Sequence, residues 1–277
     1  MRARTFVLLA AVLGLIWSQF LYMRPTIENS RPAFEIEQAK LDRFDSRPAR
    51  SILILGNSRT YYHGMPHMIR LIADKESAPQ KYQVTTRTLP GVSFEDLWGD
   101  SVTRQLLSRP WDDIILQGES RAESNDSNRN SFLTYGAQLL SLARAHGKAA
   151  LIVNWAYGEE MWQGLPIDQR ATIRAAQYQA LQRDHALLAN STNAELINVG
   201  SVWEDIRSKL PALPLVYGDG NHPTIAGSYF SALMVYAYLS HRDVSLAGYV
   251  PPDISADQAK AIRQLVNNYR FGAGESG

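Results

Sequence analysis

Short apolar runs alternate with longer segments of helical periodicity along most of the chain. Apolar runs at 52–55, 114–116, 149–154 and 195–199, together with an imperfectly alternating segment at 82–89, predict five β-strands. Apolar positions at helical spacing predict helices at 65–75, 94–107, 131–146, 167–190, 202–209, 223–239 and 256–269. Strands that alternate with helices form a parallel sheet through right-handed crossovers. The pattern therefore predicts an α/β fold with a five-stranded parallel sheet in the order 2-1-3-4-5.

The first predicted strand ends in residues that form a sharp turn. Residues 52–55 carry no charge, which is typical of a strand buried on both faces, and Gly56, Asn57 and Ser58 follow. Such a turn presents a hydroxyl at the carboxyl edge of a parallel sheet, where α/β proteins place their chemistry. Ser58 is therefore a candidate nucleophile.

A candidate base for this serine lies far downstream. Asp219 precedes His222 by three residues, so one turn can hold both side chains. The carboxylate then fixes the tautomer of the imidazole, and the other ring nitrogen faces the nucleophile. A serine needs such a base at neutral pH, and the base needs such an orienting group.

These two motifs resemble the SGNH (GDSL-like) hydrolases over residues 50–240. The opening Gly56-Asn57-Ser58-Arg59-Thr60 is similar to the Gly-Asn-Ser-x-Thr branch of that family. The resemblance implies a flavodoxin-like, three-layer α/β/α sandwich and a catalytic triad of Ser58, His222 and Asp219. It also implies an oxyanion hole built from the N–H of Ser58, a glycine N–H after the second strand, and an amide after the third.

The sequence offers candidates for the other two oxyanion donors. Gly91 stands where the family has its glycine, although a turn glycine with positive φ explains the same residue. After the third predicted strand, Gln117-Gly118-Glu119-Ser120 replaces the usual Gly-x-Asn-Asp. Gln117 is the expected amide donor, and Asn154, at the end of the fourth predicted strand, is the alternative.

Composition narrows the possible functions. The chain has 277 residues with 45% hydrophobic content, enough for one large domain. A formal net charge of +1 gives no support for a nucleic-acid partner. There is no cysteine, which excludes disulfides, thiolate catalysis and cysteine-bound metal. His63 and His67 have no third residue at matching spacing, so we expect neither a metal nor a cofactor.

The N-terminus predicts export. Basic residues at 2 and 4 precede an apolar run of about 18 residues at 6–23. The run ends in bulky residues without a small-residue cleavage site, so an uncleaved membrane anchor is favoured over a cleaved signal peptide. The expected organisation is an anchor or signal at 1–24, a linker at 25–49, a hydrolase domain at 50–271 and a flexible tail at 272–277. The domain is then expected in the periplasm or cell exterior.

The expected activity is ester hydrolysis by a serine nucleophile. The location favours a small acyl group, such as acetyl, on a carbohydrate or cell-envelope polymer. Trp155, Tyr157 and Trp162 either line a sugar-binding cleft or pack a loop against the domain. Two other functions stay open: an acyltransferase with the same triad, and a non-catalytic, membrane-tethered binding or assembly protein. The oligomeric state is not predicted.

Overall fold

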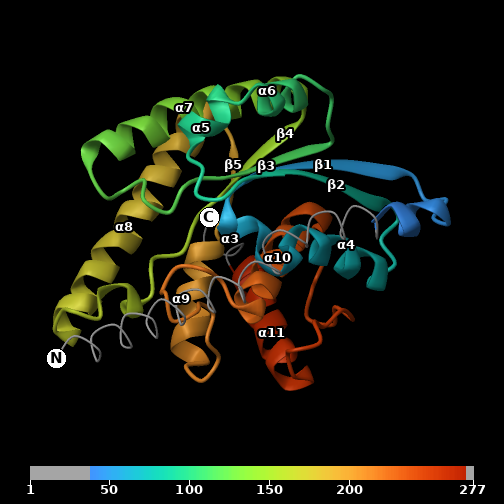
Figure 1. Cartoon of the computed structure of the whole chain (residues 1–277). Coiled ribbons are helices and arrows are strands. Elements are labelled where there is room, and N and C mark those ends of the chain that lie inside the picture. Colours follow the sequence, from blue (N-terminus) through green and yellow to red (C-terminus); the bar gives the residue numbers. More distant parts are fainter. Residues whose placement is uncertain (1–37, 273–277) are drawn as a thin grey trace, which may run out of the picture. The chain divides into compact units, whose positions relative to one another are not determined.

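A computed structural model of the chain describes residues 38–272 (Figure 1). The chain divides into two units, Met1–Phe44 and Asp45–Gly277. In the first unit, residues 38–43 are helical. The predicted anchor at 1–24, the first part of the linker at 25–49 and the tail beyond residue 272 lie outside the described residues. The remaining description concerns the second unit.

The second unit is built around a five-stranded parallel sheet in the order β2-β1-β3-β4-β5, as predicted. The strands are β1 (Ala49–Gly56), β2 (Lys81–Thr88), β3 (Asp113–Gln117), β4 (Lys148–Ile152) and β5 (Glu195–Ile197). Leu55 of β1 pairs with Arg87 of β2 and Leu116 of β3, so these three strands end close together. The carboxyl ends of the strands therefore bring their following loops to one edge.

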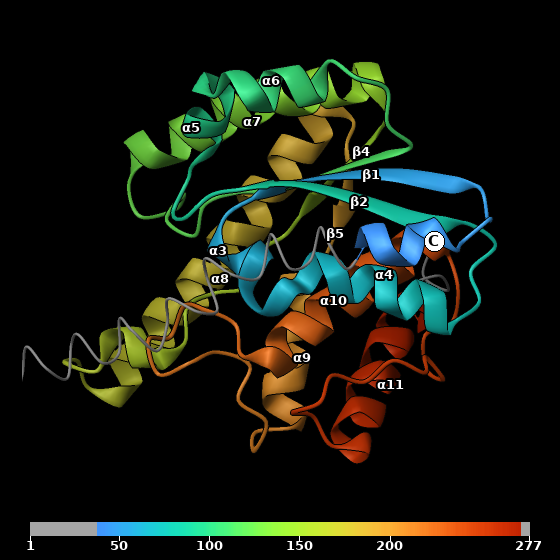
Figure 2. The same ribbon diagram turned by 45° about the vertical axis from the view of Figure 1, so that its right-hand side comes forward.

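Helices cover both faces of the sheet (Figures 1 and 2). One face carries α5 (Phe94–Gly99), α6 (Ser101–Leu107), α7 (Asp126–His146) and α8 (Ile167–Thr192), and the other carries α4 (Met65–Lys75), α9 (Val199–Lys209), α10 (Ile225–Ser240) and α11 (Ala256–Gly272). Between them lie the short elements α3 (Ser58–Tyr61), η1 (Tyr62–Gly64) and η2 (Glu159–Trp162). The fold is thus the predicted three-layer α/β/α sandwich.

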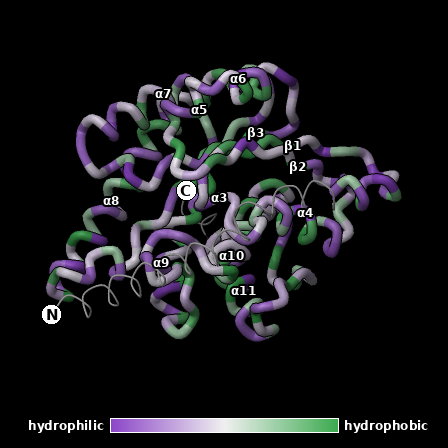
Figure 3. Tube along the Cα trace, in the orientation of Figure 1, coloured by the Kyte–Doolittle hydropathy of each residue, from purple (hydrophilic) through white to green (hydrophobic). Residues whose placement is uncertain are grey.

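The central strand β1 is buried on both faces because apolar side chains follow one another without a break. Leu53 and Leu55 pack in a core cluster with Phe94 of α5, Phe132 of α7 and Leu188 of α8. Side chains alternate along a strand, so Ile52 and Ile54 project to the opposite face, and all four are 0% exposed. Figure 3 shows the same arrangement: the central strands are mostly hydrophobic, and hydrophobic and hydrophilic residues alternate along the helices.

Two helix predictions needed correction. The predicted helix at 94–107 is two helices, because the side chain of Asp100 accepts a hydrogen bond from Thr103 N and caps α6. Ser93 and Asp96 form a capping box at the start of α5. The helix predicted to start at 131 starts five residues earlier, where Asn125 caps it through Asn128 N.

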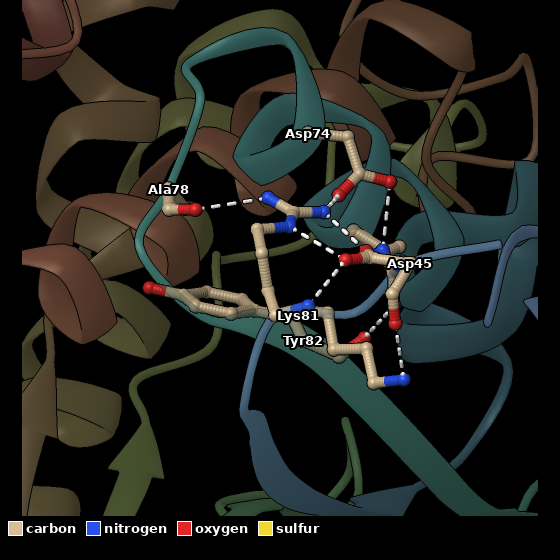
Figure 4. A network of polar contacts seen from close by, with 7 residues as sticks. Asp45, Asp74, Ala78, Lys81 and Tyr82 are labelled. Atoms are coloured by element: carbon tan, nitrogen blue, oxygen red, sulfur yellow. Dashed lines mark hydrogen bonds and ion pairs between the residues drawn. The ribbon is translucent and has the colours of Figure 1, made fainter.

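A polar network holds the start of the second unit against α4 and β2 (Figure 4). Arg70, 1% exposed, donates to Asp74 at 2.7 Å and to Asp45 at 2.9 Å. Arg47 binds both of these carboxylates, and Lys81 Nζ donates to the carbonyl of Asp45 at 2.9 Å. The network fixes the segment that leads into β1. It therefore fixes the amino end of the strand that Ser58 follows.

Within residues 38–272, no helix has the length and apolar character needed to cross a membrane.

Candidate active site

Ser58 is the first residue of α3, at the end of β1. Asn57 caps this helix, with its side chain accepting from Arg59 N at 3.2 Å. Gly56 permits the close approach at this turn, since a Cβ there would lie 2.6 Å from Thr60 Oγ1 and 2.9 Å from Gln117 Oε1. The strand, the missing side chain and the cap together fix the hydroxyl of Ser58 at the carboxyl edge of the sheet.

The structure brings Ser58 together with His222 and Asp219. Ser58 Oγ lies 3.0 Å from His222 Nε2, and His222 Nδ1 lies 2.6 Å from Asp219 Oδ2. The other oxygen of Asp219 accepts from the backbone N–H groups of Asn221 and His222, at 2.8 and 3.0 Å. This is the geometry in which a carboxylate orients an imidazole and the imidazole deprotonates a hydroxyl.

Asp219 is held in its ionised form. Burial acts to raise the pKa of this carboxyl, but hydrogen bonds from the His222 ring and from two backbone N–H groups outweigh it. The net result is a pKa below the ordinary range. A carboxylate that stays charged keeps the hydrogen on Nδ1 of His222, which leaves Nε2 free to accept the proton of Ser58.

The loop of the base is fixed by residues of several elements. An isolated antiparallel bridge joins Val216 to Pro223, and Tyr217 N donates to the carbonyl of His222 at 2.9 Å. Gly158 N donates to the carbonyl of Gly220 at 2.7 Å, which holds η2 against this loop. Gly220 has a φ of +68°, and a Cβ there would lie 2.7 Å from Met161 N, so only glycine fits.

Arg59 links the two halves of the site and was not among the predicted residues. It is 2% exposed, and its guanidinium donates to Asn221 Oδ1 at 3.0 Å and to the carbonyl of Trp155 at 2.7 Å. The same group lies over the rings of Trp155 and Tyr157. Burial lowers the pKa of Arg59 to about 10, so it remains charged at neutral pH. The sequence offers one signal for this role: Arg59 is a charged residue between a predicted strand at 52–55 and a predicted helix at 65–75.

Tyr62 was also missed as a site residue. Its ring stacks on the ring of His222, with centroids 4.5 Å apart and planes 11° apart. The ring of Tyr217 lies 6.5 Å from that of Tyr62, measured between centroids, and the Tyr217 hydroxyl shares a hydrogen bond of 2.9 Å with His63 Nε2. The sequence shows only two neighbouring tyrosines before a helix, and their contact with residue 222 arises from the fold.

The candidate oxyanion donors differ in their present partners. Gly91 has a φ of +65°, as expected for a turn glycine, and within residues 38–272 the N–H groups of Ser58 and Gly91 have no hydrogen-bond partner. Gln117 Nε2 donates to the carbonyl of Gly118 and to Asn154 Oδ1, so both of its amide hydrogens are in use. Asn154 Nδ2 also donates to the carbonyl of Gly118, at 3.0 Å.

Gln117 is instead placed under the nucleophile turn. Its Oε1 accepts from Asn57 N at 3.1 Å and from Thr60 Oγ1 at 2.9 Å. Since a backbone N–H can only donate, the amide oxygen must face Asn57, and this orientation of the side chain is fixed. The oxyanion role of Gln117 remains a prediction that requires one of its existing bonds to break.

The three aromatic residues predicted either to line a cleft or to pack a loop, Trp155, Tyr157 and Trp162, differ in burial and in their partners. Trp155 is 1% exposed and stacks on Trp203 with centroids 4.0 Å apart, so it packs in the interior and does not line a cleft. Tyr157 is partly buried, and its hydroxyl donates to Ser120 Oγ at 2.8 Å. Trp162 meets Tyr157 edge to face and is partly exposed. Of the three, only Tyr157 and Trp162 stay candidates for contact with a substrate.

The chain is similar to known proteins in structure but not in sequence. No protein-family model and no curated protein matches the sequence. A DUF4886 family protein from Bacteroides uniformis superposes with a TM-score of 0.64 at 16% identity, over 83% of this chain and 97% of that chain.

Two further solved structures carry names with an activity. A putative GDSL-like lipase from Parabacteroides merdae gives a TM-score of 0.54 at 13% identity, over 71% of this chain and 98% of that chain. An acetyl xylan esterase gives 0.53 at 15% identity, over 68% and 99%. These proteins share the five-stranded parallel sheet between two helical layers. The chain therefore has the fold of the SGNH (GDSL-like) hydrolases.

Proposed function

We propose that this protein is a serine esterase in which Ser58, His222 and Asp219 form the catalytic triad. The observation that supports it is the continuous chain of hydrogen bonds from Ser58 Oγ through the imidazole to the carboxylate, at 3.0 and 2.6 Å. The fold shared with a putative GDSL-like lipase and an acetyl xylan esterase is consistent with ester hydrolysis.

In the proposed reaction, Ser58 Oγ attacks the acyl carbonyl carbon while His222 Nε2 takes the hydroxyl proton. The tetrahedral intermediate places its negative charge on the former carbonyl oxygen, and the N–H groups of Ser58 and Gly91 are the donors available for it. The imidazolium returns its proton to the leaving alcohol, which leaves an acyl ester on Ser58. Water, deprotonated by His222, then attacks this ester and releases the carboxylic acid.

The substrate class we propose is a small acyl ester, such as an acetyl group, on a carbohydrate of the cell envelope. By its name, the acetyl xylan esterase among the solved structures acts on acetyl esters of a polysaccharide, which supports this class. The N-terminal sequence supports an exported domain, tethered through residues 6–23. The proposed export is tested by fusing residues 1–45 to alkaline phosphatase, which is active only after export. An inactive fusion would contradict the proposed location.

The activity is tested with p-nitrophenyl acetate on the full chain and on Ser58→Ala and Asp219→Asn variants. Ser58→Ala removes the nucleophile and should abolish turnover. Asp219→Asn preserves the loop, since Asn Oδ1 still accepts from the backbone, but presents N–H to Nδ1 of His222 and favours the wrong tautomer. It should lower kcat by about 10³- to 10⁴-fold. Substantial turnover by folded Ser58→Ala would contradict the proposal. Formation of an acylated sugar in place of free acid, when a sugar acceptor is added, would indicate an acyltransferase.

A further inference from the structure

The ring of Tyr62 covers one face of the base. The two rings are nearly parallel, at 11°, with a centroid separation of 4.5 Å. Tyr62 is 6% exposed, whereas the side chain of His222 is 23% exposed. The two ring nitrogens of the imidazole have polar partners, Asp219 at Nδ1 and Ser58 at Nε2. The phenol ring is thus the group that meets the π face.

Tyr62 is tied to the nucleophile through the backbone. Tyr62 N donates to the carbonyl of Ser58, which closes the single turn of α3. The ring of Tyr62 also meets Tyr61, with centroids 5.7 Å apart, and Tyr217, at 6.5 Å. The hydrogen bond between Tyr217 and His63 holds the second of these contacts in place. The ring and the Ser58 hydroxyl are therefore presented to His222 by one rigid segment.

This position matters most when His222 carries a proton. The imidazolium that forms during attack has both N–H groups engaged in its plane, so its charge is exposed to the faces of the ring. The face of an aromatic ring attracts a cation whose centre lies within about 6 Å of the centroid. Burial raises the pKa of Tyr62 to about 12, so the stacked ring is a neutral phenol over the working range of an esterase. Its attraction therefore comes from the π system.

We propose that Tyr62 is a positioning residue that holds the His222 ring in line with Ser58 and stabilises its protonated form as the reaction proceeds. The inference rests on the proposed function of the triad. A contact that strengthens on protonation lowers the barrier to attack and leaves substrate binding unchanged. An attraction of this kind corresponds to roughly a 2- to 30-fold effect on rate.

The test compares Tyr62→Phe, which keeps the ring, with Tyr62→Leu and Tyr62→Met, which replace it by aliphatic side chains. With p-nitrophenyl acetate, the two aliphatic variants should lose kcat by about 2- to 30-fold with KM unchanged, and Tyr62→Phe should stay within about threefold. The thermal unfolding midpoint of each variant shows that it is folded. Methionine is included because its flexible chain fills an irregular space if leucine does not fit.

Two readouts separate this inference from the proposed function. The ring protons of His222 should shift downfield in NMR spectra of the aliphatic variants, because the ring current of Tyr62 is lost, and should stay in place in Tyr62→Phe. The rate at which a phosphonate labels Ser58 should fall in the same order as kcat, and it needs no turnover. If wild type labels but does not turn over esters, the function fails while the labelling rates still decide the role of Tyr62. Equal labelling and kcat in Tyr62→Leu, Tyr62→Met and wild type would overturn the proposal, and so would the absence of labelling in wild type.

Discussion

The replacement of Gln117 by methionine separates two roles for this side chain. Methionine has a similar length and volume but cannot accept the hydrogen bonds that Gln117 Oε1 receives from Asn57 N and Thr60 Oγ1. Both donors are buried, with Asn57 4% and Thr60 0% exposed. Leaving a buried donor unpaired costs about 1–3 kcal/mol, and the Thr60 hydroxyl can rotate to reduce its share. We expect a loss of about 3 kcal/mol in the free energy of unfolding.

The assay is urea unfolding of wild type, Gln117→Met, Thr60→Val and the double variant. A loss of about 3 kcal/mol corresponds to a thermal midpoint roughly 6–12 °C lower for a domain of this size. Thr60→Val alone removes a donor together with its need for a partner and should cost about 0.5–1.5 kcal/mol. In the Gln117→Met background the same change removes an orphaned hydroxyl and should cost nothing. The double-mutant cycle therefore measures the bond itself.

The kinetic result completes this test. If Gln117 anchors the nucleophile turn, the loss of stability accompanies any loss of kcat. If its amide instead holds the oxyanion, kcat falls by about 10²- to 10³-fold while unfolding stays unchanged. Unchanged unfolding of Gln117→Met would refute the reasoning from the structure and return the oxyanion role to this residue.

Two further predictions concern the dependence of stability on pH. Burial raises the pKa of Glu123 to about 8, above its unfolded value, so ionising this group favours the unfolded chain and stability falls as pH rises toward 8. Urea unfolding of Glu123→Gln should show a gain over wild type at pH 8.5 and almost none at pH 4, and equal stability at both would contradict the burial. Conversely, hydrogen bonds from Arg47 hold the pKa of Asp45 well below its unfolded value of 3.8, so its contribution is present above that pH and is lost as pH falls further. Asp45→Asn should therefore unfold at lower urea than wild type at pH 7, and the difference should narrow as the pH falls below 3.8. A difference that stays constant between pH 7 and pH 2 would contradict the ion pair.

The sheet could be predicted because its signal is local. The strands β1, β3 and β4 are short and mostly apolar, and the alternation of strands with helices predicts a parallel topology before any contact is known. The break at Asp100 was not predictable in the same way. Residues 94–107 have helical spacing throughout, while Asp100 is held by Thr103 and also by Arg87 of β2, at 2.8 Å. That second contact exists only after the strand and helix have met.

The site shows the same division. The placement of Ser58 follows from the rule that strand ends share one edge, and Asp219 and His222 were paired with it as candidates by their spacing and motif. The contacts of Arg59 and Tyr62 do not, because both depend on where the 217–222 loop comes to rest. The direction of the Gln117 amide depends in turn on the backbone N–H of Asn57, which donates to its oxygen. The roles of Arg59, Tyr62 and Gln117 are seen only from their contacts in the folded chain, and neither periodicity nor motif spacing contains those contacts.

The distance along the chain between nucleophile and base has a consequence for how activity arises. Ser58 and His222 are 164 positions apart, with the whole sheet after β1 encoded between them. During synthesis, Ser58 is made early. It stays without its base until residue 222 has been made and the 217–222 loop has docked. Contacts of such long sequence separation form late, because closing a long loop carries a large entropic cost. The proposed esterase activity would then appear only after this loop has docked, and a truncated or partly folded chain would lack it.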